Sequence, residues 1–236
     1  MTRELLLLAA VAGASVAMLH AWEQRRQPGA GAILCLGDSL TEEGWSGLET
    51  WPELLARSGA VGQVVNAGRS GSTTREVLDS WRGARGRQPY RWVAVLAGVN
   101  DLWLGKVPRD ESLRNLRTIW SEARADGARV VVMTTSPFQG DRQGLWTPAK
   151  QAEQDRLNES IREEARAQGY GLVDTWDLLR SPGHPQALDP DCDAGDGVHL
   201  DQAGQARISE AVARALGRQG APSGPRRAEP HRRAPW

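Results

Sequence analysis

Short apolar runs alternate with longer amphipathic segments between Gly29 and Leu216. The runs are rich in Val, Ile, Leu and Ala, which is typical of strands buried on both faces, and the longer segments repeat apolar residues at helical spacing. The expected strands are Ala32–Leu36, Gln63–Asn66, Trp92–Ala97, Arg129–Thr134 and Gly171–Asp174. The expected helices are Trp51–Ser58, Thr73–Trp81, Asp110–Asp126, Pro148–Gln168 and Asp201–Leu216. This alternation predicts a parallel sheet covered by helices on both faces, an α/β fold with three α/β/α layers.

Polar motifs follow four of the expected strands. Ser39 comes after the first strand, Gly68–Gly71 after the second, Asn100-Asp101 after the third and Asp196–His199 after the fifth. Ligands of parallel sheets bind outside the carboxyl ends of the strands. The sequence therefore predicts a site at this edge, built from segments far apart in the chain.

Three of these residues have the chemistry of a nucleophilic triad. The hydroxyl of Ser39 is a poor nucleophile until a base takes its proton, and His199 is the expected base. Asp196, three residues before His199, is expected to orient the imidazole and stabilise its charged form. The order Ser, Asp, His is one of several in which such triads occur.

Acyl transfer also requires donors for the negative oxygen that develops in the transition state. We expect three: the backbone N–H of Ser39, the backbone N–H of Gly71 and the side-chain amide of Asn100. Gly68 is a competing candidate for the glycine donor, and Gly71 is preferred because it lies next to the start of a helix. Asp101 is expected to brace a loop and not to take part in the chemistry.

Four sequence blocks carry a family resemblance. They are Gly37-Asp38-Ser39-Leu40, Asn66 to Gly71, Gly98-Val99-Asn100-Asp101 and Asp196-Gly197-Val198-His199. In this order and at these spacings they resemble the SGNH hydrolases, the GDSL-type esterase and lipase superfamily, over about residues 32–215. The resemblance implies a flavodoxin-like parallel sheet of about five strands and no metal or organic cofactor.

By the same resemblance, Ser39 is the nucleophile, Asp196 and His199 complete the triad, and Gly71 and Asn100 donate to the oxyanion. The implied activity is hydrolysis of a carboxylic ester through an acyl-enzyme, with a short-chain or acetyl ester as the expected substrate. Acyl transfer to a sugar or alcohol, and lysophospholipid or thioester hydrolysis, stay open. A binding domain with an inactive site is the non-enzymatic alternative.

The tryptophans are numerous, ten against one Phe and two Tyr. Trp45, Trp103 and Trp146 fall in the loops expected after the first, third and fourth strands, on the edge that carries the triad. They are candidates for lining an acyl or aryl pocket. Packing of long loops explains them equally well. The tryptophans expected in the core are Trp51, Trp81, Trp92 and Trp120.

Length and charge exclude other classes. The chain has 236 residues, enough for one substantial domain, and 29 basic residues balance 29 acidic ones. This balance argues against a nucleic-acid partner, which usually requires a basic excess. The expected partner is a small-molecule or lipid ester.

The two ends of the chain differ from the middle. Residues 5–19 are apolar or small, with Arg3 before them and Arg25-Arg26 after them, which predicts a signal peptide or a membrane anchor. The catalytic domain is then expected outside the cytoplasm. The predicted division is an export or anchor segment at 1–28, a hydrolase domain at 29–217 and a disordered Arg- and Pro-rich tail at 218–236.

Other candidate sites are weaker. A disulfide between Cys35 and Cys192 is an open alternative if the protein is exported. Asp189–Asp193 resembles a calcium loop, but it lacks the glycine and glutamate that such loops need, so no metal site is expected. His184 lies between Gly183 and Pro185 and is expected in a surface loop.

Overall fold

The computed structural model describes residues 31–42, 47–138, 146–184 and 186–220. Its centre is a five-stranded parallel sheet with the order β2-β1-β3-β4-β5. The strands are β1 Ala32–Gly37, β2 Gln63–Gly68, β3 Trp92–Leu96, β4 Arg129–Met133 and β5 Gly171–Val173. The number, order and direction of the predicted strands are confirmed, with bounds that differ by one or two residues.

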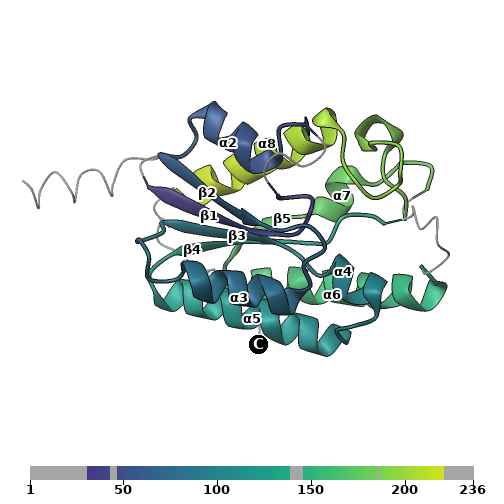
Figure 1. Ribbon diagram of the computed structural model, residues 1–236, viewed down its shortest axis with the longest axis horizontal. Coiled ribbons are helices and arrows are strands. Elements are labelled where there is room, and N and C mark those ends of the chain that lie inside the picture. The colour runs from purple at the N-terminus through teal and green to yellow at the C-terminus, as the bar shows by residue number, and fades with distance from the viewer. Residues whose placement is uncertain (1–30, 43–46, 139–145, 185, 221–236) are drawn as a thin grey trace, which may run out of the picture.

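Helices cover both faces of the sheet, so the predicted three-layer architecture is confirmed (Figure 1). One face carries α2 and α8, and the other carries α3, α5 and α6. The bounds are α2 Trp51–Ser58, α3 Thr74–Ala84, α5 Arg109–Ala125, α6 Pro148–Gln168 and α8 Gln202–Gly220. The loops that follow the strands gather at the right of Figure 1, and this is the edge to which the sequence assigns the site.

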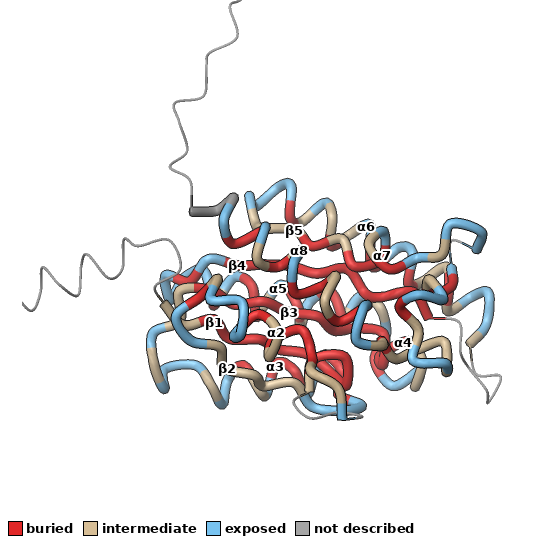
Figure 2. The backbone as a smooth tube through the Cα atoms, turned by 90° about the horizontal axis from the view of Figure 1, so that it is seen from above, coloured by how far each residue is buried: buried red, intermediate tan, exposed pale blue. Residues whose placement is uncertain are grey.

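The core consists of two apolar clusters, one on each face of the sheet. Successive side chains of β1 alternate between them: Ile33 and Cys35 pack toward α2 and α8, while Leu34 and Leu36 pack toward α3 and α5. The buried strands form a continuous band through the middle of the molecule (Figure 2). A sheet buried on both faces is rigid, and it fixes the starting points of the loops that carry the site.

Three short elements were not expected from the sequence: α4 Val99–Leu104, α7 Thr175–Leu179 and a 3-10 turn at Pro190–Cys192. Gly98, with φ +120°, precedes α4, and Gly105, in the left-handed region, ends it. The loop position predicted for Trp103 is therefore wrong, because Trp103 lies in α4. A helix this short has too few turns to show an apolar period.

The ends of the domain are only partly described. Helix α8 continues to Gly220, three residues beyond the predicted domain end at 217. Residues 1–30 and 221–236 lie outside the described residues, as does the predicted export or anchor segment. Within the described ranges, no helix is long and apolar enough to cross a membrane. Cys35 and Cys192 are buried free thiols, so the structure contains no bond between them.

Candidate active site

The serine loop leaves the sheet at Gly37, the last residue of β1. A Cβ at Gly37 would lie 2.6 Å from the carbonyl oxygen of Leu96 on the neighbouring strand, so a larger residue does not fit. The carbonyl oxygen of Asp38 then accepts hydrogen bonds from the N–H groups of Thr41 and Glu42, both at 3.0 Å. These bonds close a tight turn that presents Ser39, which is 8% exposed, at the edge of the sheet.

Ser39, His199 and Asp196 form a continuous hydrogen-bonded chain. Ser39 Oγ lies 3.1 Å from His199 Nε2, and His199 Nδ1 lies 2.6 Å from Asp196 Oδ2. When Nδ1 carries its proton and donates it to Asp196, Nε2 is free to accept the hydroxyl proton of Ser39. Ser39 and His199 are 160 positions apart in the sequence, yet their side chains lie within the distance that proton transfer needs.

The loop that carries His199 is shaped by two aspartates. Asp193 Oδ1 accepts hydrogen bonds from the backbone N–H groups of Gly195, Asp196 and Gly197. Asp196 Oδ1 accepts from the N–H groups of Val198, at 2.9 Å, and His199, at 2.8 Å. The two aspartate side chains thus accept from backbone N–H groups that a helix or strand would otherwise pair, and they hold the loop in local turns.

The charge state of Asp196 follows from these bonds. Burial disfavours its ionised form, but the hydrogen bonds from the His199 backbone and ring and from Val198 outweigh it and hold the pKa of Asp196 below its ordinary value. Asp196 is therefore an anion at neutral pH, as a partner of an imidazolium must be.

Three candidate oxyanion donors belong to residues that line the same pocket as Ser39. The backbone N–H groups of Ser39 and Gly71 have no hydrogen-bond partner among the residues described. Asn100 Nδ2 donates one hydrogen to the carbonyl oxygen of Ser72 at 3.1 Å, which leaves its second hydrogen available. Ser39, Gly71 and Asn100 all line one cavity of about 440 Å³, together with Asp196 and His199. This cavity is called the triad pocket below.

The structure separates the two candidate glycines. The N–H of Gly68 donates to Asn66 Oδ1 at 2.9 Å, and a Cβ at Gly68 would lie 2.6 Å from the backbone of Thr41. Gly68 is thus a packing glycine whose donor is already used. Gly71 has φ +71°, borders the triad pocket and has open space around its Cα. The geometry favours Gly71 as the donor.

Asp101, next to Asn100, is fully buried and ties α4 to the start of α3. Its two oxygens accept hydrogen bonds from the backbone N–H and the hydroxyl of Thr74, at 2.7 and 2.6 Å. Thr74 begins α3 directly after Gly71-Ser72-Thr73. Asp101 therefore fixes the glycine donor relative to the amide donor, as a brace of the kind the sequence suggested.

Asp38 is the second buried carboxyl near Ser39. Burial raises its pKa to about 7, against the lowering effect of the hydrogen bond that Leu40 N–H donates to Oδ1, and the negative charge of Asp101 raises it further. No signal in the sequence distinguishes Asp38 from an ordinary ionised aspartate.

The three candidate tryptophans lie in different places. Trp103 lines the triad pocket, and its ring lies 5.8 Å from that of Phe138. Trp146 lies 4.6 Å beyond Phe138 and borders a separate cavity of about 450 Å³. Trp45 lies outside the described residues. The sequence missed Phe138, the one phenylalanine of the chain, which borders both cavities.

A row of buried amides on α6 was also missed. Gln151, Gln154 and Asn158 are at most 6% exposed. Gln154 Nε2 donates to the carbonyl oxygen of Ser136, which lines the triad pocket, and Asn158 Oδ1 accepts from Thr135 N–H. The available signal was three amides at helical spacing on the face that also carries Leu157 and Ile161.

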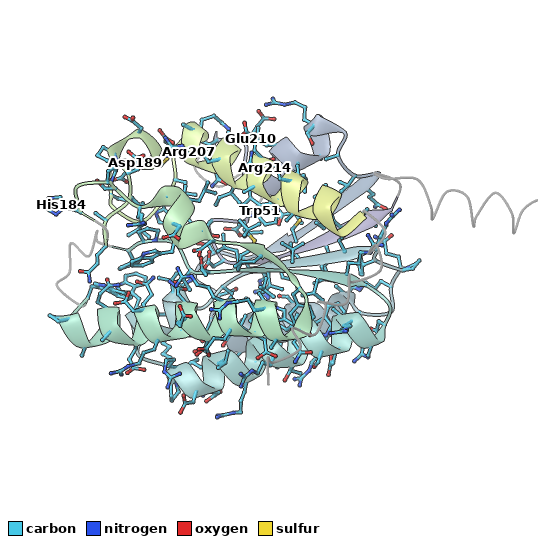
Figure 3. The ribbon with its side chains drawn as sticks, turned by 180° about the vertical axis from the view of Figure 1, so that it is seen from behind. Trp51, His184, Asp189, Arg207, Glu210 and Arg214 are labelled. Atoms are coloured by element: carbon cyan, nitrogen blue, oxygen red, sulfur yellow. The ribbon has the colours of Figure 1, made fainter. Side chains whose placement is uncertain are left out.

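The remaining candidates lie away from the triad. Figure 3 shows His184 on a loop that points away from the domain, and Asp189 beside Arg207 of α8. Asp189 forms an ion pair with Arg207 at 2.9 Å, which uses one carboxylate of the calcium-like segment. Among the residues described, no group of three or more His, Cys, Asp or Glu side chains is placed to hold a metal ion.

Comparison with known proteins places this geometry in a family. The sequence pattern of the GDSL-like Lipase/Acylhydrolase family matches residues 35–207. An acetylxylan esterase of Geobacillus stearothermophilus is 25% identical over 217 residues, which cover 78% of this chain and 93% of that protein.

Solved structures share the fold. A GDSL-like lipase from Bacteroides thetaiotaomicron matches with a TM-score of 0.67 at 21% identity. The match covers 86% of this chain and 97% of the lipase chain. The crystal structure of the acetylxylan esterase Axe2 from Geobacillus stearothermophilus has a TM-score of 0.63 at 23% identity, with coverages of 83% and 98%. The chain belongs to the GDSL-like lipase/acylhydrolase family and is an ester-hydrolysing enzyme.

Proposed function

We propose that the protein is a serine esterase that hydrolyses short-chain carboxylic esters, above all acetyl esters. The observation that carries this proposal is the chain from Ser39 Oγ through His199 to Asp196, with contacts of 3.1 and 2.6 Å. The printed name of the Geobacillus relative, an acetylxylan esterase, supports acetyl as the acyl group.

In the proposed mechanism, Ser39 Oγ attacks the ester carbonyl while His199 Nε2 takes the hydroxyl proton. The carbonyl oxygen becomes an oxyanion and accepts hydrogen bonds from the N–H groups of Ser39 and Gly71 and from the amide of Asn100. The C–O bond to the alcohol then breaks, and His199 returns the proton to the departing oxygen. Water, deprotonated by His199, attacks the acyl carbon, the bond from that carbon to Ser39 Oγ breaks, and His199 returns the proton to Oγ as the acid leaves.

The test is direct detection of the acyl-enzyme. Full-length protein mixed with 4-nitrophenyl acetate should release a burst of nitrophenol equal to the enzyme concentration, and acid-quenched protein should carry one acetyl group on the peptide that contains Ser39. A fluorophosphonate probe should label the same residue. Turnover without any labelling of Ser39 would refute the mechanism, and labelling that transfers to an added alcohol faster than to water would indicate an acyltransferase.

Export is a separate part of the proposal. The apolar residues 5–19, flanked by arginines, favour a signal peptide or an anchor that carries the catalytic domain out of the cytoplasm. Cell fractionation tests it, because full-length protein found freely soluble in the cytoplasm would contradict both forms. Sequencing the N-terminus of the mature protein distinguishes cleavage from anchoring.

A further inference from the structure

The cavity next to the triad pocket has a lining unlike that of an acyl pocket. We call it the second cavity; it measures about 450 Å³, and the residues used below are Phe138, Trp146, Gln151 and Asp155. Phe138 also borders the triad pocket, so the two cavities are neighbours on either side of this residue. We propose that the second cavity binds a sugar ring, the alcohol part of an ester whose acetyl group is held at Ser39. This inference rests on the proposed esterase function.

The aromatic part of the cavity suits the C–H face of a pyranose. The rings of Phe138 and Trp146 lie 4.6 Å apart and are tilted by 44°. The face of an aromatic ring is electron-rich, and it attracts the weakly positive C–H groups on the flat side of a sugar. Such a contact buries apolar surface of the sugar while its hydroxyl groups point sideways.

The polar part of the cavity suits those hydroxyl groups. Asp155 Oδ1 accepts a hydrogen bond from Gln151 Nε2 at 3.0 Å. Asp155 has no ion-pair partner in the described part of the chain, so its second oxygen is available to accept from a ligand. A carboxylate acceptor binds a hydroxyl donor strongly.

The same groups exclude the other plausible occupants. A long acyl chain in the second cavity would remove water from the carboxylate of Asp155 and the amide of Gln151 without offering a hydrogen bond, which is costly. An anionic ligand would be repelled by Asp155. A neutral polyhydroxy compound satisfies both the aromatic and the polar lining, and the geometry therefore assigns Trp146 to the alcohol part of the ester.

The cavity is organised before a ligand arrives. Trp146 Nε1 donates to Gln151 Oε1 at 3.0 Å, and Gln151, only 6% exposed, holds Asp155 with its amide nitrogen. Gln151 also donates to Gln154, which is bonded to the carbonyl oxygen of Ser136 in the triad pocket. One hydrogen-bonded row thus sets the indole, the carboxylate and a wall of the triad pocket, and binding needs little reordering.

The first experiment measures binding without catalysis. Full-length Ser39→Ala protein is titrated with xylotriose, cellotriose and chitotriose by calorimetry, and with methyl hexanoate, which is uncharged, as an acyl-chain probe. At least one sugar should bind. Adding Trp146→Ala should weaken that binding by about tenfold, as loss of one aromatic contact predicts, and adding Asp155→Asn should weaken it by a similar factor.

The matched control is Glu163→Gln, an exposed acid on the same helix, which should leave sugar binding unchanged. Asp155→Asn keeps the oxygen that accepts from Gln151, so it tests the cavity even if Trp146→Ala fails to fold. No sugar binding, sugar binding that is unaffected by both substitutions, or methyl hexanoate binding that depends on Trp146 would overturn the assignment.

The second experiment uses two acetyl esters that differ only in the alcohol: acetylated xylotriose and 4-nitrophenyl acetate. In the active enzyme, Trp146→Ala should lower the ratio of kcat/KM for the sugar ester to that for the phenyl ester by about tenfold. An unchanged ratio contradicts the sugar assignment. If the wild type hydrolyses neither ester, the proposed function fails, and the binding experiment still decides on the cavity.

Discussion

Ser39 and His199 are hydrogen-bonded to each other, but they differ in burial and in the elements that hold them. Ser39, 8% exposed, lies in the loop after the central strand β1, and Asn100, 7% exposed, lies in α4, which follows the central strand β3. The side chains of His199 and Asp196 are 23% and 40% exposed, and they lie in a loop near the C-terminal end of the domain. The proposed nucleophile and the proposed amide donor are therefore positioned by the core, whereas the proposed base is positioned mainly by hydrogen bonds within its own loop.

We call Ser39 and Asn100 the buried half of the site, and Asp196 and His199 the exposed half. The two halves depend on different interactions, so different substitutions should disrupt them. The buried half is fixed by packing, such as the contact between Gly37 and Leu96, and by Asp101, which ties α3 to α4. The exposed half depends on Asp193 and Asp196, whose oxygens accept five backbone N–H bonds between them. Substitutions in each half should distinguish effects on the chemical step from effects on stability and on the position of the loop.

The largest effect should come from breaking the shared hydrogen bond from either side. Ser39→Ala and His199→Ala should each lower kcat/KM for 4-nitrophenyl acetate by several orders of magnitude, and the double variant should be little worse because the pair acts as one unit. Circular dichroism checks that the fold is kept. Activity above about a tenth of the wild type in folded Ser39→Ala protein would rule out Ser39 as the nucleophile.

The buried half also carries Asn100, the proposed amide donor. Asn100→Ala should lower kcat by about 10²–10³ with a smaller change in KM, because the second amide hydrogen is needed mainly when charge develops on the carbonyl oxygen. Steady-state kinetics on one acetyl ester measures both constants. A rise in KM with an unchanged kcat would show that Asn100 binds the ground state and is not an oxyanion donor.

Asp38 allows a test of how much the burial of a carboxyl group beside Ser39 lowers the stability of the protein. Its pKa rises from 3.8 to about 7, so the folded protein retains a proton that the unfolded chain loses, and stability falls as pH rises between these values. Asp38→Asn cannot ionise, and its oxygen can still accept from Leu40 N–H. The variant should gain stability relative to the wild type from pH 4 to pH 8, by at most ~4 kcal/mol.

Urea unfolding of both proteins at each pH measures the difference, in which other titrating groups cancel. A constant difference would mean that Asp38 is ionised throughout this range. The opposite trend, with the wild type gaining stability as pH rises, would mean that the carboxylate has a cationic partner that outweighs burial.

These two halves also explain what the sequence could and could not predict. The strands and the long helices follow from apolar periods that extend over many residues, and Ser39, Asn100, Asp196 and His199 stand in short motifs at strand ends. Phe138 and the amides of α6 belong to no such motif. The helical spacing of the amides indicates a buried face, but it does not indicate that this face lies beside the triad pocket. Whether Gly68 or Gly71 has a free N–H depends on Asn66, a tertiary detail that no spacing reveals.

The exposed half offers a test of loop position alone. Asp193→Ala removes the acceptor of three backbone N–H groups and leaves the three side chains of the proposed triad in place. The kcat should therefore fall by about tenfold through misplacement of His199, with a modest loss of stability. Asp193→Asn keeps one acceptor oxygen and should restore most of the activity. Asp191→Ala, exposed and two residues away, is the control. Equal losses in Asp193→Ala and Asp193→Asn would assign the effect to charge instead of loop geometry.

The smallest effect concerns the wall of the triad pocket between the two halves. Trp103 lies in α4 three residues after Asn100, the proposed amide donor, and its ring lies 5.8 Å from that of Phe138. If it contacts the acyl group, Trp103→Ala should change the preference between acetate and butyrate esters of nitrophenol more than it changes the rate on acetate. One methylene in an apolar pocket is worth only ~1–3 kcal/mol, so the ratio of kcat/KM should move by about tenfold while the chemistry survives. Equal losses on both esters with a lower Tm would show that Trp103 packs the helix that presents Asn100, and that the acyl group is bound elsewhere in the pocket.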